Sequence, residues 1–192
     1  MAVATKISVE EYLELERSSE VKHEYENGEL REMPGGTKEH SAIGRNIIAH
    51  LYFQLEGSTC EVYNSDLRVL VEKAGLYTYP DVSVVCGEAM FEDAKQDSLL
   101  NPTVLFEVLS KSTENYDRGK KFQHYQMLPS LLDYVLVAQD EYRVEHFTRQ
   151  EEGWFLRVYV GLEASVTLPS LGCTLTLSDI YKKINLDSEA KP

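Results

Sequence analysis

Two carboxylic acids stand inside strongly apolar stretches of this 192-residue chain, and they are the first candidates for chemistry. Asp81 follows a proline in "YTYPDVSVVC", and Glu107 lies within "TVLFEVLS". Burying an ionised carboxylate is costly unless a positive charge compensates it. A divalent cation shared by both acids would remove this cost, and hard oxygen ligands on a rigid sheet suit Mg²⁺ or Mn²⁺. The alternative, which spacing alone favours, is that each acid pairs separately with a lysine or an arginine.

Lys121 is the cation that best fits the same place. It belongs to a helical segment that follows the strand of Glu107, with Asp117 and Tyr125 one turn away on the same face. Such a helix folds back across the sheet, so its lysine can reach the polar residue of the strand. The alternative is a solvated helix lysine, like the adjacent Lys120.

Glu24 and His40 are two further polar candidates. Glu24 lies on the first arm of a hairpin, indicated by the Asn-Gly turn signal at 27–28. His40 precedes Ile43 by three residues, at the start of an apolar stripe that predicts a helix over 38–55. Glu24 could instead be an exposed hairpin acid, and His40 a satisfied core histidine.

The elements that must position these side chains do not alternate regularly. A capping-box pattern at Ser8 and Glu11 begins a short amphipathic helix. Pro80 marks the edge, bulge or start of a strand, and the apolar run around Glu107 is typical of a central strand. The pattern favours a mixed α/β sheet with helices on its faces over a doubly wound fold. Further predicted elements are a half-buried strand over 67–72, a strand over 76–87, a loop over 87–100, a helix over 114–127, a strand over 131–139, a hairpin over 142–160, a strand around Val166 and a helix capped by Ser178.

Composition sets the broad class. Hydrophobic residues make up 43% and charged residues 27%, values that are ordinary for one globular domain, here expected over 1–186 with a flexible tail at 187–192. The three cysteines are widely spaced, which argues against a disulfide framework or a structural zinc site and favours a reducing cytoplasm. No apolar run approaches the ~18 residues of a membrane span.

Five blocks occur in an order that carries a family resemblance: "HEYENGEL", "GGTKEHSAI", "YPDVSVVC", "FEVLSKSTENYDRGKKFQHY" and "LLDYVLV". Together they resemble the Uma-type putative restriction endonuclease family, formerly a domain of unknown function, in the PD-(D/E)XK nuclease superfamily. The resemblance runs from about Ser8 to Ile184. It implies a restriction-endonuclease-like central mixed sheet flanked by helices, in the order α-β-β-β-α-β, with a β-rich C-terminal extension.

The resemblance also implies a catalytic centre. Asp81 matches the motif aspartate and Glu107 the following acidic position. The usual lysine would stand two residues later, where this chain has Leu109, so the role passes to Lys121 on the next helix. Lys111, in the loop beyond the strand, is a rival for that role.

Further roles follow from the same resemblance. Glu24 matches an early glutamate of such nucleases, and His40 a histidine that the family often carries. Asp81 and Glu107 would hold Mg²⁺ or Mn²⁺ with help from the Val108 carbonyl, and Glu24 would complete the ligand set or bind a second cation. His40 would orient Glu24 or the phosphate, or assist proton transfer. The implied reaction is hydrolysis of DNA phosphodiesters.

Charge limits how DNA could be held. The 19 lysines and arginines face 32 acids, for a net charge of −13, so weak or partner-assisted DNA binding is expected. A small basic rim is predicted from Arg45, Arg68, Lys111, Arg118, Lys120 and Lys121. A homodimer is also expected, with the β-rich tail from about Tyr142 as its interface.

Two other classes of function remain open. The leucine at the usual lysine position and the acidic surface suit an inactive nuclease-fold module that acts in protein–protein interaction. A pair of carboxylates could also hydrolyse sugars, but that chemistry needs an aromatic-lined cleft, and Trp154, the single tryptophan, lies far from both acids in sequence.

Overall fold

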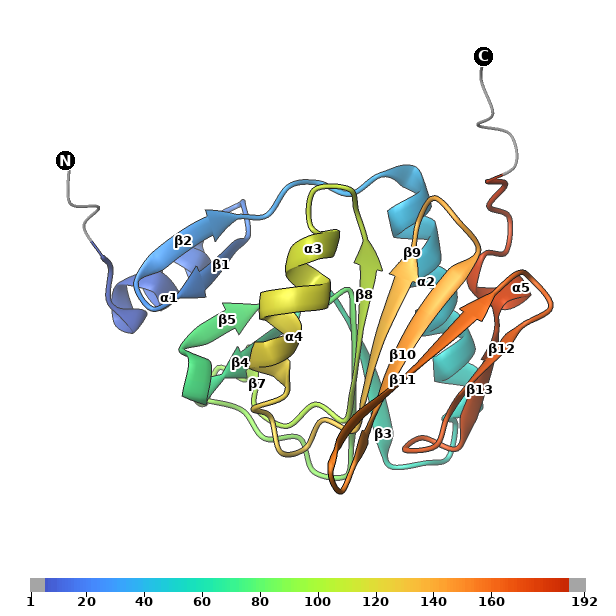
Figure 1. The fold of residues 1–192 in the computed structure, drawn as a ribbon. Helices are drawn as coiled ribbons and strands as arrows, with labels where there is room; N and C mark the ends of the chain where they lie inside the picture. Colours follow the sequence, from blue (N-terminus) through green and yellow to red (C-terminus); the bar gives the residue numbers. More distant parts are fainter. Residues whose placement is uncertain (1–5, 187–192) are drawn as a thin grey trace, which may run out of the picture.

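A six-stranded mixed sheet forms the centre of the computed structural model, which describes residues 6–186 (Figure 1). Its strand order is β11-β10-β9-β8-β6-β3. Strands β8 and β9 are parallel, and every other neighbouring pair is antiparallel. These strands are β3 (Cys60–Asn64), β6 (Val82–Cys86), β8 (Val104–Leu109), β9 (Asp133–Ala138), β10 (Arg143–Gln150) and β11 (Gly153–Val160).

A second, five-stranded sheet has the order β2-β1-β5-β4-β7. Its first two strands form the predicted hairpin, in which Asn27 and Gly28 both adopt positive φ, as the two-residue turn requires. The strands are β1 (His23–Glu26), β2 (Glu29–Glu32), β4 (Arg68–Val71), β5 (Leu76–Thr78) and β7 (Ser98–Leu99), with a 3₁₀ turn η1 (Glu72–Ala74) between β4 and β5.

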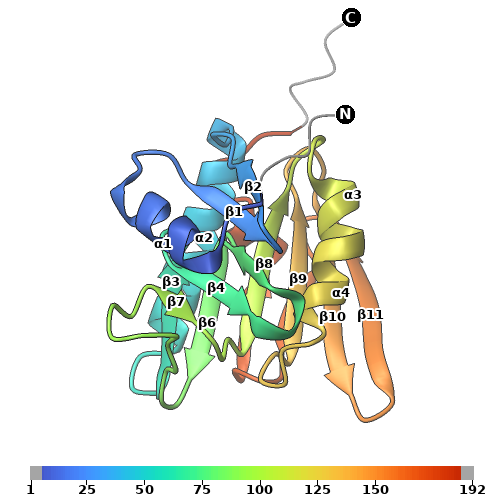
Figure 2. The same cartoon turned by 90° about the vertical axis from the view of Figure 1, so that its left-hand side faces the viewer.

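Helices cover the central sheet on both faces (Figure 2). One face of the central sheet is covered by helix α2 (Lys38–Gln54), whose Ile43, Ile47 and Leu51 belong to the core on this side. Helix α5 (Leu177–Ile180) and the strand pair β12 (Ser165–Leu168) and β13 (Cys173–Thr176) contribute to the same core. The opposite face carries a helical segment of three parts: α3 (Glu114–Tyr116), a π-helical turn η2 (Asp117–Lys121) and α4 (Phe122–Tyr125). Helix α1 (Val9–Ser18) begins at the predicted capping box.

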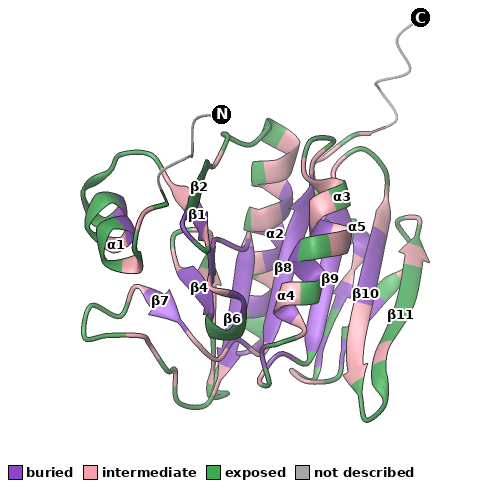
Figure 3. Cartoon of the chain, turned by 60° about the vertical axis from the view of Figure 1, so that its left-hand side comes forward, coloured by how far each residue is buried: buried purple, intermediate pink, exposed green. Residues whose placement is uncertain are grey.

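Burial follows this layering. Every residue of β8 and of β9 is buried, whereas most of the edge strand β11 is exposed (Figure 3). Glu107 therefore lies on a strand that is buried at every residue, as its apolar surroundings predicted.

The structure corrects several predicted elements. The strand predicted over 76–87 is two strands in different sheets, β5 and β6, and the chain changes sheet at Pro80. The strand predicted over 67–72 is fully rather than half buried, because β4 is covered on both faces. The loop predicted over 87–100 contains β7. Thr176 rather than Ser178 caps the last helix. The expected tail at 187–192 lies outside the described residues.

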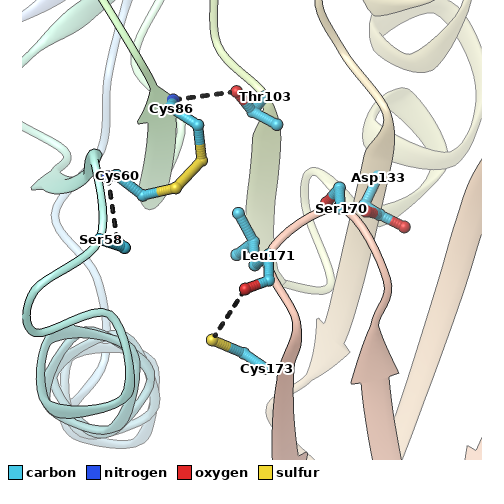
Figure 4. Close-up of a disulfide and its surroundings, with 8 residues drawn as sticks. All are labelled: Ser58, Cys60, Cys86, Thr103, Asp133, Ser170, Leu171 and Cys173. Carbon is cyan, nitrogen blue, oxygen red and sulfur yellow. Dashed lines mark hydrogen bonds between the residues drawn. A yellow bond between two sulfur atoms is a disulfide. The ribbon is translucent and has the colours of Figure 1, made fainter.

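A disulfide joins Cys60 to Cys86, contrary to the prediction from cysteine spacing (Figure 4). The two residues are direct partners in the register of β3 and β6. Sequence spacing could not show this, because the pairing depends on the register of two strands that are 26 residues apart. No helix within residues 6–186 is long and apolar enough to cross a membrane.

Candidate functional site

A groove of about 1580 Å³ runs over the ends of β6 and β8, the start of α2 and the π-helical turn. Asp81, Glu107, Lys121, Glu24 and His40 all line it. The five candidates from the sequence thus come together at one place, although they derive from five different elements or their flanks.

Strand register places Asp81 opposite Glu107. Val82 pairs with Phe106 in the antiparallel pair of β6 and β8, and one further step in the same register sets Asp81 against Glu107. Directly opposed residues of an antiparallel pair project from the same face. Glu107 faces the helical segment that follows β8, where it contacts Lys121 and Tyr125, whereas Asp81 contacts His40 at the start of α2.

Lys121 bridges the acids of this site. Its Nζ lies 2.8 Å from Glu107 Oε1, 3.4 Å from Glu24 Oε1 and 3.6 Å from Asp117 Oδ1. The side chains of Lys121 and Glu107 are each 6% exposed. The hydroxyl of Tyr125 donates to the same Glu107 oxygen at 2.8 Å. The helix lysine predicted to lean over the strand does so, and it is not solvated.

The π-helical turn sets the position of that lysine. It spans Asp117–Lys121 between two short α-helical pieces. Such turns insert one residue into an α-helix and are frequent at functional sites. Asp117 and Lys121, at its two ends, are both buried and face each other.

Asp81 is held differently from Glu107. Its Oδ2 accepts a hydrogen bond from the backbone N–H of Val108 at 2.7 Å and lies 3.3 Å from His40 Nε2. His40 therefore contacts Asp81, and within residues 6–186 no hydrogen bond or ion pair joins it to Glu24. The hydrogen bond with Asp81 raises the pKa of His40, and the charges of Asp81 and Asp117 add to this effect.

Glu24 is anchored by the second sheet. The hydroxyl of Thr78 on β5 donates to Glu24 Oε1, and Arg31 lies 3.7 Å from Oε2. Arg31 is the cross-strand partner of Glu24 in the hairpin, and its guanidinium stacks on the ring of Tyr116 at 4.7 Å. The hairpin thus brings one acid and one partly exposed cation to the groove.

Negative charge exceeds positive charge at this site. Burial raises the pKa of Glu107 well above its ordinary value, and the charges of Asp117 and Asp81 raise it further against the opposing effect of Lys121. Burial also raises the pKa of Asp117, with smaller contributions from Asp81 and Glu24. A single lysine therefore does not neutralise the carboxylates that surround it.

The donor chemistry of the site fits a hard divalent cation. Carboxylate oxygens are the ligands that Mg²⁺ and Mn²⁺ prefer, and an added cation would relieve the charge excess. As the side chains lie, no three His, Cys, Asp or Glu residues within 6–186 could jointly hold a metal ion. Glu107 Oε1 is engaged by Lys121 and Tyr125, so coordination through that oxygen requires Lys121 to withdraw.

The structure separates the two rival lysines. Lys111 is exposed in the turn after β8 and, among the described residues, makes no ion pair with Glu107. Leu109, at the usual lysine position, is buried in the apolar core. The predicted basic rim is smaller than expected, because Arg68 is buried in an ion pair with Asp97 and Lys120 pairs with Glu26.

Sequence reasoning did not assign a role to Asp117, Thr78 or Arg31. A signal existed for two of them. Asp117 stands four residues before Lys121, the spacing at which helical side chains meet. Arg31 follows from the register of an Asn-Gly hairpin, which places it opposite Glu24. Thr78 had no such signal, because its contact joins two strands that are far apart in sequence.

Comparison with solved structures identifies the class of fold. A crystal structure of "a putative nuclease belonging to DUF820" from Anabaena variabilis superposes with a TM-score of 0.75 at 21% identity, covering 91% of this chain and 97% of that one. The chain therefore has the fold of that nuclease-like structure, a mixed sheet flanked by helices, as the sequence predicted.

Sequence comparison then shows the family. The Uma2 family, described as "Putative restriction endonuclease", matches residues 9–178, and the chain belongs to this family. Two relatives from Synechocystis are uncharacterized proteins. One, slr1290, is 36% identical over 178 residues, 92% of each chain. The other, sll1609, is 32% identical over 169 residues, 86% of this chain and 96% of that one. The resemblance read from the five sequence blocks is confirmed.

Proposed function

We propose that this protein is a metal-dependent endonuclease that hydrolyses DNA phosphodiester bonds. One observation carries the proposal: Asp81 and Glu107 stand opposite each other on adjacent strands, and Lys121 reaches Glu107 and Glu24 across them. Membership of a restriction endonuclease family and a nuclease-like fold support the same chemistry.

Asp81, Glu107 and Glu24 would hold Mg²⁺ or Mn²⁺, with the Val108 carbonyl as a further oxygen ligand. When bound, such a cation polarises the scissile phosphate and lowers the pKa of a coordinated water. The Val108 N–H fixes the Asp81 carboxylate, and Thr78 fixes that of Glu24. Both carboxylates are therefore oriented before substrate binds.

Lys121 would leave Glu107 when the carboxylates take up a cation, and its ammonium group would then face the phosphate. An ammonium group aimed at developing negative charge stabilises the transition state. His40, held by Asp81, would carry a proton near the reacting phosphate. Its raised pKa favours the charged form, which suits donation to a leaving oxygen.

Plasmid nicking with Mg²⁺ or Mn²⁺ tests the proposal. Asp81→Ala should lower the nicking rate by about 100-fold or more, because it removes a ligand and the partner of His40. Asp66→Ala, an exposed acid paired with Lys22, is the matched control and should nick like wild type. Equal nicking by wild type and Asp81→Ala would point to a contaminating nuclease and defeat the proposal.

The alternative is a catalytically inactive module that acts in protein–protein interaction. The exposed apolar side chains of β11 favour it, because such edges invite association. The thermal stability of the protein with and without Mn²⁺ distinguishes these two proposed functions. An active centre gains thermal stability with added Mn²⁺, and Asp81→Ala abolishes that gain, whereas an inactive module shows no shift.

We propose DNA as the substrate, held weakly or with a partner's help, and a homodimer as the assembly. Phe155, Leu156, Val158 and Val160 expose apolar surface along the free edge of β11, which lies within the tail predicted as an interface. Light scattering should give a dimer for wild type and a monomer for Leu156→Lys. A monomeric wild type would refute the assembly.

We further propose that residues 1–186 form a single nuclease-like domain with a cytoplasmic location, where DNA is accessible. The Cys60–Cys86 pair bears on this location, because disulfides are rare in a reducing compartment. In the cytoplasm the two residues would remain as neighbouring thiols. Alkylation of freshly lysed cells followed by mass analysis would show both cysteines modified, and a protected pair would contradict the proposed location.

A further inference from the structure

The groove continues beyond the candidate active site along the outer face of α2. Ser41, Arg45, Ile48 and Tyr52 line it at helical spacing and follow His40, which touches Asp81. From His40 to Tyr52 the helix rises about 18 Å. At the ~3.4 Å rise of a stacked strand this length accommodates about five nucleotides, and fewer if the strand is extended.

The far end of this face carries two exposed aromatic rings. Tyr52 is 65% exposed and Phe53 73%, and their rings meet edge to face at 6.0 Å. Large aromatic side chains are usually at least half covered in a folded protein. Tyr52 lines the end of the groove and Phe53 lies beside it outside the lining, so their rings offer an apolar surface on which a base could stack.

The cations of the groove are few. Ten acids and six lysines or arginines line it. Lys22, Arg31, Arg118 and Lys121 are paired with acids. Within residues 6–186, Arg45 and Lys111 are left without an ion pair, and Arg45 bonds only to the amide oxygen of Asn46.

This charge distribution bears on the kind of nucleic acid. A duplex carries about one negative charge per 1.7 Å of its axis, and its binding depends on many phosphate contacts. Two free cations in an acidic groove cannot supply them. A single strand has half the linear charge, and stacking on aromatic rings provides affinity that is independent of phosphate contacts.

We infer that the α2 face binds single-stranded DNA, with Arg45 on a phosphate and Tyr52 or Phe53 stacked on a base. The substrate then enters as a single-stranded segment, such as an overhang or an unpaired stretch, that runs along α2 into the site of Asp81. This inference rests on the proposed nuclease function and names its substrate class.

Fluorescence anisotropy with a labelled oligothymidylate in EDTA tests the inference, because the probe is not cleaved without a metal ion. Tyr52→Ala should weaken binding by about fivefold to 150-fold, the loss expected for one stacked base. Tyr52→Phe keeps the ring and should bind like wild type. Arg45→Ala should reduce the salt slope by about 0.7, and Arg45→Lys should restore it.

Three outcomes would overturn the inference: unchanged oligothymidylate binding by Tyr52→Ala and Phe53→Ala, tighter binding of a duplex than of the single strand, and tighter binding of oligouridylate than of oligothymidylate. Hydrolysis of bis(p-nitrophenyl) phosphate with Mn²⁺ tests the nuclease function separately from DNA binding by the α2 face. This small diester has no base to stack and does not extend along α2, so its hydrolysis by wild type reports the nuclease function alone. Loss of that activity in wild type itself would count against the nuclease function and not against the α2 face.

Discussion

Two charged regions of this protein are organised in opposite ways. Beneath α1, two cations face two acids: Arg17 pairs with Asp93 and Asp97, and Arg68 also pairs with Asp97. In the groove, Glu24, Glu107 and Asp117 share the single ammonium group of Lys121. The first arrangement stabilises the fold. The second leaves charge uncompensated, which is costly for stability and useful for binding a cation or handling a phosphate.

The largest effect is expected from Glu107→Gln, which should separate activity from stability. The amide can still accept the hydrogen bond of Tyr125, and Lys121 keeps Asp117 and Glu24. Nicking should fall by about 100-fold or more, because a ligand is lost. The free energy of unfolding at neutral pH should rise by about 1–2 kcal/mol, because a buried charge is removed. Urea denaturation and plasmid nicking measure both, and a loss of stability would contradict the charge excess.

Arg68→Met makes the reverse test in the compensated region. Arg68 is 3% exposed and holds Asp97 at 2.8 Å. Its removal leaves a carboxylate short of a partner and should lower the free energy of unfolding by about 3 kcal/mol. Hydrolysis of bis(p-nitrophenyl) phosphate by the folded variant should stay within about twofold of wild type. A large loss of hydrolysis without a loss of stability would show that the two regions are not separate.

The smallest effects are expected in the pH dependence of stability. As pH falls, the contribution of Asp97 should lower the stability, whereas the contribution of Glu107 should raise it. Hydrogen bonding to Arg17 lowers the pKa of Asp97 from 3.8 to about 2. Its stabilisation is therefore present above 3.8 and is lost as pH falls toward about 2. The pKa of Glu107 is raised above 4.5. Its destabilisation is therefore present above that raised pKa and is relieved as pH falls toward 4.5.

Variants isolate these contributions from those of the other acids. The stability gap between wild type and Asp97→Asn should narrow as pH falls below 3.8. The advantage of Glu107→Gln over wild type should narrow as pH falls from 7 toward 4.5. Urea midpoints at a series of pH values measure both gaps, and gaps that stay constant with pH would contradict the assigned ionisation states.

Local signals predicted much of the fold and of the site. The capping box at Ser8, the Asn-Gly turn and the apolar run of β8 each specify structure through neighbouring residues, and all three are confirmed. Lys121 was found because a helix that follows a central strand must fold back over it. The predictions that were wrong concern contacts between residues that are far apart in the sequence. Arg68 looked like the exposed side of an alternating strand, yet Tyr12 of α1, Tyr79 and Asp97 surround its side chain.

Other features lie beyond local patterns for the same reason. The change of sheet at Pro80 depends on which strands are available as partners, and alternation of residue types does not encode that choice. The contact of His40 with Asp81 depends on where α2 begins relative to β6. The π-helical turn has no recognisable signature in "DRGKK".

The single extra residue of that π-helical turn has a geometric consequence. In an ordinary α-helix each residue advances the azimuth by about 100°, so removing Gly119 would swing everything upstream around the axis by roughly that angle relative to Phe122 and Tyr125. Asp117 lies upstream of Gly119 and Lys121 lies downstream of it, so this one residue sets the angle between the two side chains around the helix axis. A one-codon change in length at this turn would therefore move Asp117 around the helix axis relative to Lys121, while the lysine keeps its position relative to Phe122 and Tyr125.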